Sequence, residues 1–356
     1  MERAWLKRKI QVCYPCSGFL TLVVCLLLAS AGWVQAADTR IAFMSTRNAN
    51  NGEIFLMNSD GKRVRQLTRH LQYDSAPAWS PDGKKITYVS FRGAPKPRGE
   101  IYVMNPDGTN PINLTQSPEI AEGVSSWSPD GKRIAYKSFG IFNANGFFQS
   151  DIWVMDADGE NQRNLTNHIA GDWHPDWSPD GKQIVFQSDR NSDWEFDIWG
   201  GNWEVYAMDP DGASLVNLTK HPAKDGSPAW SPDGNQIAFT SNRDGNTEVY
   251  VMNADGTNPI NLTNHPARDG GPSWSPDGMR IAFSTNRDGN WEKKPNDNWE
   301  VYVMNADGTN LINLTNHPKW DSGPAWEPAP SLHVASKGRL VTLWGKVKRA
   351  NIYNGK

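Results

Sequence analysis

The sequence predicts an all-β protein, a six-bladed β-propeller made of four-stranded antiparallel blades. Three observations lead to this fold: a unit recurs six times, each unit holds four short stretches of alternating apolar residues, and tight-turn motifs separate those stretches. One tryptophan per unit marks the repeat, at intervals of 48, 50, 53, 44 and 52 residues: Trp79, Trp127, Trp177, Trp230, Trp274 and Trp326. Helical repeats are excluded because Gly and Pro interrupt every unit.

The fifth unit illustrates how each blade is expected to be built. Its four strands are expected at residues 228–231, 236–241, 247–253 and 259–263. A Ser-Pro-Asp-Gly motif separates the first two strands, and an Asp-Gly motif separates the last two; both motifs are typical of tight turns. Strand alternation then places the second-to-third and fourth-to-first connections on one face of the ring, and the two tight turns on the other.

The phase of the repeat predicts that the ring is closed by its own ends. The first unit begins with a second strand at residues 41–43, and the last unit ends with a first strand at residues 324–326. We expect these two strands to pair, so that residues 37–328 form one propeller and no open sheet edge is left where the chain ends meet.

The repeats resemble those of the TolB-like propeller family, whose blades carry a Trp-Ser-Pro-Asp-Gly turn, an Ile-Ala-Phe strand and a Tyr-Val-Met-Asn strand before an Asp-Gly turn. The resemblance covers residues 40–328. It implies an exported propeller that binds a partner, since TolB is a periplasmic component of an envelope-spanning complex. TolB carries an α/β domain before its propeller. Here the repeats follow closely on the predicted leader, so that domain is expected to be absent.

Residues 1–36 are predicted to form a secretory signal peptide. A basic start precedes an uncharged apolar segment at 18–34, and short residues at 34–36 suit a signal peptidase. The alternative is an uncleaved anchor, although 17 residues lie at the short limit for a membrane span. We expect a periplasmic or secreted protein that touches a membrane only if this signal is uncleaved. All three cysteines lie in the leader: Cys13, Cys16 and Cys25.

The charge balance limits the possible partners. The chain has 36 Lys and Arg against 39 Asp and Glu, a net charge of −3, and shows no basic face. Nucleic acid is therefore excluded as an expected partner. The segment 329–356 differs in containing six Lys or Arg and no acidic residue. It could form an extra strand or serve as a sorting or docking tag.

A polar trio recurs on the face of the longer connections: a His after the Leu-Thr pair, an Asp four residues later, and an Arg after the second strand. The members are His70, His168, His221, His265 and His317; Asp74, Asp172, Asp225, Asp269 and Asp321; and Arg47, Arg92, Arg190, Arg243 and Arg287. The third unit has Ser117, Ala121 and Gly140 instead, although Glu122 could replace the Asp with a one-residue shift. Because all three are lost together, we expect an Asp–Arg hydrogen bond, with the His fastening the loop to it.

A metal ring is the alternative explanation of the trio. Five His and five Asp converging at a pore could bind a divalent cation. A structural role is favoured, because a residue present in nearly every blade serves to build each blade, and His on distant blades would be too far apart to share one ion. We therefore expect no metal and no cofactor.

Three second-to-third connections are enlarged, at 139–150, 189–203 and 286–299, and they are rich in aromatic residues. The candidate partner-binding residues are Phe147, Phe148, Trp194, Phe196, Trp199, Trp203, Trp291 and Trp299, with Trp153, Trp173 and Trp320 expected nearby. Exposed aromatic side chains mark binding sites, but such loops can also fold over the ring and bury one another. A protein or polysaccharide of the cell envelope is the expected partner.

An enzyme is the competing hypothesis. No Gly-x-Ser-x-Gly motif is present, and a chain without cysteine after the leader has no thiol nucleophile. A lyase or glycosidase using paired carboxylates would have candidates in the enlarged connections: Glu195, Asp197, Glu292 and Asp297. No spacing singles them out, so no catalytic residue is assigned. The preferred hypothesis is a non-catalytic, exported interaction protein.

Overall fold

The computed structural model describes residues 39–48, 51–92, 98–117, 120–139, 150–192, 201–289 and 298–329. The chain divides into Met1–Asp38 and Thr39–Lys356, and every described residue belongs to the second part. The expected signal peptide with its cysteines, and the basic tail from residue 330 onward, lie outside the described residues. Within the described segments, the chain forms no helix with the length and hydrophobicity of a membrane span.

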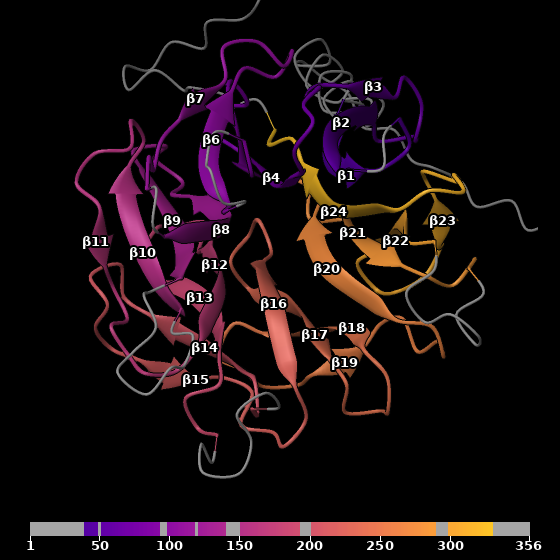
Figure 1. The fold of residues 1–356 in the computed structure, drawn as a ribbon. Coiled ribbons are helices and arrows are strands. Elements are labelled where there is room, and N and C mark those ends of the chain that lie inside the picture. The colour runs from indigo at the N-terminus through magenta and orange to yellow at the C-terminus, as the bar shows by residue number, and fades with distance from the viewer. Residues whose placement is uncertain are drawn as a thin grey trace, which may run out of the picture. The chain divides into compact units, whose positions relative to one another are not determined.

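Six four-stranded antiparallel sheets form the propeller, as predicted (Figure 1). Blades 1 to 3 contain β24 (Asp321–Trp326), β1 (Arg40–Ser45), β2 (Glu53–Asn58) and β3 (Arg65–Gln66); β4 (Asp74–Trp79), β5 (Ile86–Ser90), β6 (Glu100–Met104) and β7 (Ile112–Asn113); and β8 (Ala121–Trp127), β9 (Arg133–Phe139), β10 (Ser150–Asp156) and β11 (Arg163–Asn164). Blades 4 to 6 contain β12 (Asp172–Trp177), β13 (Ile184–Ser188), β14 (Glu204–Met208) and β15 (Val216–Asn217); β16 (Asp225–Trp230), β17 (Gln236–Ser241), β18 (Glu248–Asn253) and β19 (Ile260–Asn261); and β20 (Asp269–Trp274), β21 (Arg280–Thr285), β22 (Glu300–Asn305) and β23 (Ile312–Asn313).

The ring closes inside blade 1, which confirms the prediction from the repeat phase. Strand β24 pairs with β1 in antiparallel register, with Ala325 opposite Ala42. Beyond this pairing, the Nε of Arg40 donates to the Oε2 of Glu327 at 2.7 Å, and its second nitrogen contacts Oε1. The backbone N–H of Glu327 returns a bond to the carbonyl of Arg40 at 2.8 Å. Main-chain and side-chain bonds therefore fasten the two ends together.

Apolar side chains between neighbouring blades form the core. In blade 4, Val185 and Val205 share a core cluster with Trp230 and Phe239 of blade 5, and all four are at most 8% exposed. Burial of each such side chain contributes about 1.5–3 kcal/mol. The same alternation recurs around the ring, so each blade is held by both of its neighbours.

The Asp-Gly turns also join the blades, which explains why they recur together with the Leu-Thr pair. Gly256 has a φ of +85°, and a Cβ there would collide with the carbonyl oxygen of Leu218 in the preceding blade. The glycine of all six Asp-Gly turns meets the Leu of the preceding blade in this way. Glycine is needed both for the left-handed backbone and for the close approach.

Two expected strand boundaries were wrong for a local reason. The first strand of blade 5 begins at Asp225, three residues before the expected start, because a bulge at Ser227, with a φ of +47°, interrupts the alternation. The fourth strand spans only Ile260–Asn261. It ends early because the hydroxyl of Thr263, rather than a backbone carbonyl, accepts the N–H of Val249 at 3.1 Å.

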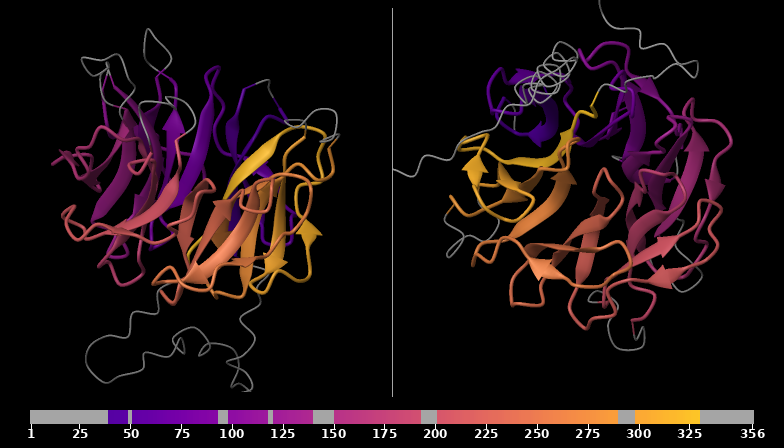
Figure 2. Two further views of the ribbon diagram at one scale, coloured as in Figure 1. Left: turned by 90° about the horizontal axis from the view of Figure 1, so that it is seen from below. Right: turned by 180° about the vertical axis from the view of Figure 1, so that it is seen from behind.

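The connections segregate to two faces, as the alternation predicted (Figure 2). The loop face carries the second-to-third connections and the fourth-to-first connections, such as 67–73 and 314–320. The turn face carries the Ser-Pro-Asp-Gly turns, such as 231–234, and the Asp-Gly turns, such as 255–256. First strands surround the central channel, and the two-residue fourth strands lie at the rim (Figure 1).

Candidate binding face

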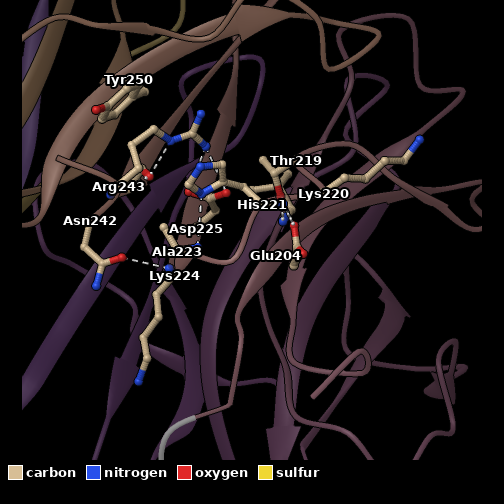
Figure 3. Close-up of polar contacts among 12 residues, drawn as sticks. Glu204, Thr219, Lys220, His221, Ala223, Lys224, Asp225, Asn242, Arg243 and Tyr250 are labelled. Atoms are coloured by element: carbon tan, nitrogen blue, oxygen red, sulfur yellow. Dashed lines mark hydrogen bonds and ion pairs between the residues drawn. The ribbon is translucent and has the colours of Figure 1, made fainter. Parts of the chain in front are cut away.

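A repeated ionic brace supports the loop face. In blade 5, Arg243 donates to both carboxylate oxygens of Asp225 at 3.0 and 3.1 Å (Figure 3). Its Nε donates to the hydroxyl of Ser241 at 2.8 Å. The guanidinium also lies over the rings of Phe239 and Tyr250. Burial raises the pKa of Asp225, while Ser241 and Arg243 oppose that rise. The same ion pair joins Arg47 to Asp321, Arg92 to Asp74, Arg190 to Asp172, and Arg287 to Asp269.

The histidines brace the loops through the backbone. The Nδ1 of His221 accepts the N–H of Ala223 at 3.0 Å, and the backbone N–H of His221 donates to Glu204 at 3.1 Å. Figure 3 shows the imidazole between Glu204 and the pair formed by Asp225 and Arg243. Equivalent bonds link each of the other four histidines to the backbone two residues on and to an acid on the third strand.

Sequence reasoning missed the acid that opens each third strand. Glu248 accepts hydrogen bonds from the hydroxyl of Thr263 and the backbone N–H of His265. It therefore fixes the start of the fourth-to-first connection to the third strand. The signal was visible, because an acid precedes the apolar run of every third strand: Glu53, Glu100, Asp151, Glu204, Glu248 and Glu300.

Blade 3 lacks the brace and has a buried carboxyl at the position of its Asp. Glu122 lies opposite Ser138, the register position that Asp takes in the other blades. Its Oε2 has no hydrogen-bond partner among the described residues, and burial together with the charge of Glu100 raises the pKa of Glu122 to about 8. Lys137, which lies opposite Gly123 on the same two strands, is also buried, and its ammonium lies 3.5 Å from the ring centre of Trp173. Burial lowers the pKa of Lys137 to about 7.

Two of the eight aromatic candidates fall within the described residues. Trp203 packs edge-on against Trp173 with ring centres 5.4 Å apart, and Trp299 stacks on Trp320 at 6.3 Å and 18°. Both are half-buried, so each is partly covered by a neighbour on the same face. The other six candidates lie outside the described residues: Phe147, Phe148, Trp194, Phe196, Trp199 and Trp291.

Large apolar side chains on the fourth-to-first connections are exposed on the loop face. Leu71 is 92% exposed, Ile169 52%, Trp320 42% and Tyr73 38%. Leu71 and Ile169 were missed by sequence reasoning. The available signal was that they follow the repeated His, where the other three such connections have Pro. Exposed large apolar side chains on one face are typical of contact surfaces.

The central channel encloses a cavity of about 620 Å³ between the first strands. Blade 4 alone places His174 and Asp176 there, at positions where the other blades have small or apolar residues. Asp176 accepts the hydroxyl of Ser126 at 2.9 Å and the N–H of Trp230 at 2.8 Å, and so connects blades 3, 4 and 5. Burial raises the pKa of Asp176 to about 6. No group of three metal-ligating side chains occurs among the residues described.

Comparison with known proteins supports the resemblance drawn from the repeats. The family model described as the TolB beta propeller domain matches residues 31–194. The chain carries a TolB-like β-propeller. A second family model, the Tricorn protease N-terminal beta propeller domain, matches residues 200–294. The crystal structure of TolB from Acinetobacter baumannii superposes with a TM-score of 0.68 at 25% identity, covering 87% of this chain and 71% of that one.

Curated relatives match the TolB-like propeller over shorter spans. An uncharacterised protein of Agrobacterium fabrum is 29% identical over 193 residues, which are 52% of this chain and 60% of that protein. The Tol-Pal system protein TolB of Actinobacillus succinogenes is 45% identical over 56 residues, which are 16% of this chain and 13% of that protein. The chain therefore covers less than two thirds of the length of either relative.

The carboxylates proposed for an enzyme cannot be placed on the TolB-like propeller. Glu195, Asp197, Glu292 and Asp297 all lie outside the described residues. The described connections of the loop face are held by hydrogen bonds and ion pairs and carry exposed apolar side chains. This arrangement is suited to binding.

Proposed function

We propose that this chain is an exported, non-catalytic binding protein whose TolB-like propeller presents its loop face to a protein partner in the cell envelope. The observation that carries the proposal is the exposure of Leu71, Tyr73, Ile169 and Trp320 on that face. These side chains lose contact with water when a partner covers them, and that loss of exposed apolar surface is favourable.

Rigidity supports a binding role for these connections. Each connection that carries a repeated His is tied at its start to a third-strand acid and at its end to the Asp–Arg brace. Leu71 and Tyr73 lie between two such anchors, and Trp320 precedes the braced Asp321. A surface that is already ordered spends little conformational entropy on binding, so modest apolar contacts suffice for affinity.

Export and an envelope location rest on the sequence and on the relatives. Residues 1–36 have the pattern of a signal peptide. The relatives that share the propeller include proteins named for the Tol-Pal system. Cell fractionation of the full chain tests this part: we expect the processed protein in the periplasm or medium, and retention in the cytoplasm would contradict export.

Partner capture with matched variants tests the binding face. The double variant Leu71→Ala with Trp320→Ala removes two exposed apolar side chains. Leu71 lies on the connection from blade 1 to blade 2, and Trp320 lies on the connection from blade 6 to blade 1. Met279→Ala is the control, because Met279 is 70% exposed but lies beside a tight turn on the opposite face. We expect one envelope protein to be retained by the wild type and by Met279→Ala and lost with the folded double variant. Equal retention by all three proteins would contradict the proposal, and retention of a protease-resistant glycan would replace the protein partner with a polysaccharide.

A further inference from the structure

Three blades each lay an arginine over the tryptophan of the next blade. In each case the arginine directly precedes the first Ile of the second strand, and its guanidinium carbon lies 4.6–5.1 Å from the ring centre. The pairs are Arg40 with Trp79, Arg133 with Trp177, and Arg280 with Trp326. A guanidinium stacks on an indole through cation–π attraction and planar contact. The repeat thus contains a guanidinium position beside its tryptophan.

This position is open beside Trp127. The equivalent residue is Lys85, whose Nζ instead donates to the side-chain carbonyl of Asn105 at 2.9 Å. Among the described residues, no Lys or Arg lies over the ring of Trp127. Trp127 is half-buried, whereas the other five repeat tryptophans are at most 8% exposed. The replacement of Arg by a tethered Lys therefore leaves the indole of Trp127 partly exposed, with no guanidinium over its ring among the described residues.

A groove of about 690 Å³ surrounds this indole on the turn face. Its apolar lining includes Ile112, Leu114 and Pro81. Its charged lining consists of three carboxylates and one ammonium, that of Lys85, so the groove is acidic. The carboxylates are Asp82, Asp130 and Asp158. Asp82 is already paired with Lys84, while Asp130 and Asp158 each use Oδ1 to accept a backbone N–H of their own turn. An aromatic face next to carboxylates suits a planar cation.

The corresponding groove between blades 5 and 6 is smaller, and its tryptophan is more deeply buried. There Gln236 occupies the position of Lys85, Trp274 is only 8% exposed, and the cavity measures about 300 Å³. The indole Nε1 is bonded in both grooves: that of Trp274 donates to the carbonyl of Ala229 at 3.2 Å, and that of Trp127 donates to the hydroxyl of Thr87 at 3.1 Å. The two sites therefore differ in the exposure of the ring and not in the bonding of its N–H. Absence of the arginine alone therefore does not expose the tryptophan. The greater exposure of the ring is specific to the Trp127 groove.

We propose that the Trp127 groove binds the arginine side chain of a partner polypeptide, with its guanidinium over the indole where three other blades place an arginine of their own. The site lies on the turn face, opposite the loop face of the proposed function, and does not depend on that function. Arginine is favoured over lysine because its planar, weakly hydrated guanidinium can stack on the ring and bond a carboxylate at the same time.

Titration of the full chain with a short peptide tests the proposal. The probe is acetyl-Gly-Arg-Gly-amide, and the control peptide carries citrulline, which keeps the shape of arginine and removes its charge. Binding is followed by NMR at the indole N–H of Trp127, assigned with Trp127→Phe. We expect the arginine peptide to shift this signal and to bind about tenfold more tightly than the citrulline peptide. Equal binding of the two peptides would overturn the proposal.

Two substitutions at one position sharpen the test. Lys85→Arg supplies the internal guanidinium found in three other blades, so we expect it to reduce binding of the arginine peptide at least about tenfold. Lys85→Gln removes the ammonium without supplying a stacking group and should retain binding. Unchanged binding by Lys85→Arg would refute the site. Binding that appears only after Arg339→Ala with Arg349→Ala would show that the chain's own basic tail occupies the groove, and would overturn the assignment to a partner.

Discussion

Glu122 lies opposite Ser138 in the pairing of β8 with β9, at the position where the other five blades hold the aspartate of the ionic brace. This carboxyl is 4% exposed and has no arginine among the described residues to pair with. Blade 3 therefore keeps the position of the carboxyl in the brace but has glycine, Gly140, at the position of the arginine. The consequence is a group whose protonation is coupled to folding.

Glu122 should make folding stability depend on pH. Its pKa is raised from 4.5 to about 8 by burial and by Glu100, so the folded state holds the proton more tightly than the unfolded chain. This contribution is complete below pH 4.5 and is lost as pH rises toward 8, with a slope of up to about 1.4 kcal/mol per pH unit. Urea unfolding of the wild type and Glu122→Gln between pH 5 and 7 measures it. The variant should lose less stability over this range, and parallel curves would contradict the assignment.

Lys137 should make the folded state more stable as pH rises, the opposite of the effect of Glu122. Burial lowers its pKa from 10.5 to about 7, so its contribution to stability grows as pH rises from 7 toward 10.5. Lys137→Met keeps the aliphatic contact with Trp173 and removes the titrating group. We expect the difference in unfolding free energy between variant and wild type to shrink from pH 7 to pH 10. A difference independent of pH over that range would count against a buried ammonium.

Removal of one brace arginine should lower the free energy of unfolding substantially. Arg243→Ala leaves the carboxylate of Asp225, which is 1% exposed, without its ion-pair partner. The expected loss is about 3–5 kcal/mol in urea unfolding. Adding Asp225→Asn should recover part of this loss, because a neutral amide is less costly to bury than an unpaired charge. Lys224→Ala, an exposed change in the same connection, should stay within about 0.5 kcal/mol, and a comparable loss there would show that the brace is not special.

The hydrogen bonds between Arg40 and Glu327, where the two ends of the propeller meet, should contribute more to stability than exposed ion pairs do. Glu327→Ala removes the three hydrogen bonds that this side chain accepts from Arg40, whose pKa is raised by its bond to Glu327. Since the pair is partly buried, we expect a loss of about 1–2 kcal/mol. Lys62→Ala breaks the exposed pair with Asp60 and should change stability by at most about 0.5 kcal/mol. Equal effects of the two variants would mean that the bonds between Arg40 and Glu327 add no more stability than an exposed ion pair.

The repeats predicted the propeller, while departures from the repeat decide the site. Six blades and their closure followed from the tryptophan spacing and the phase of Ile41 and Trp326, because each repeated residue has the same surroundings in every blade. The first strands were placed too short, because the left-handed residue at the bulge breaks the period of two. The exposure of Leu71 and of Trp127 also depends on neighbouring blades, so the local signals, Leu in place of Pro after His70 and Lys85 in place of Arg, do not determine it alone.

The central claim, that the loop face binds a protein, is tested most directly by photo-crosslinking in cells. A benzoylphenylalanine at Leu71, the most exposed apolar position of the loop face within the described segments, is compared with the same group at Met279 on the opposite face. We predict one discrete crosslinked protein from position 71 and none from position 279. No crosslink at position 71, or the same product from both positions, would contradict the account.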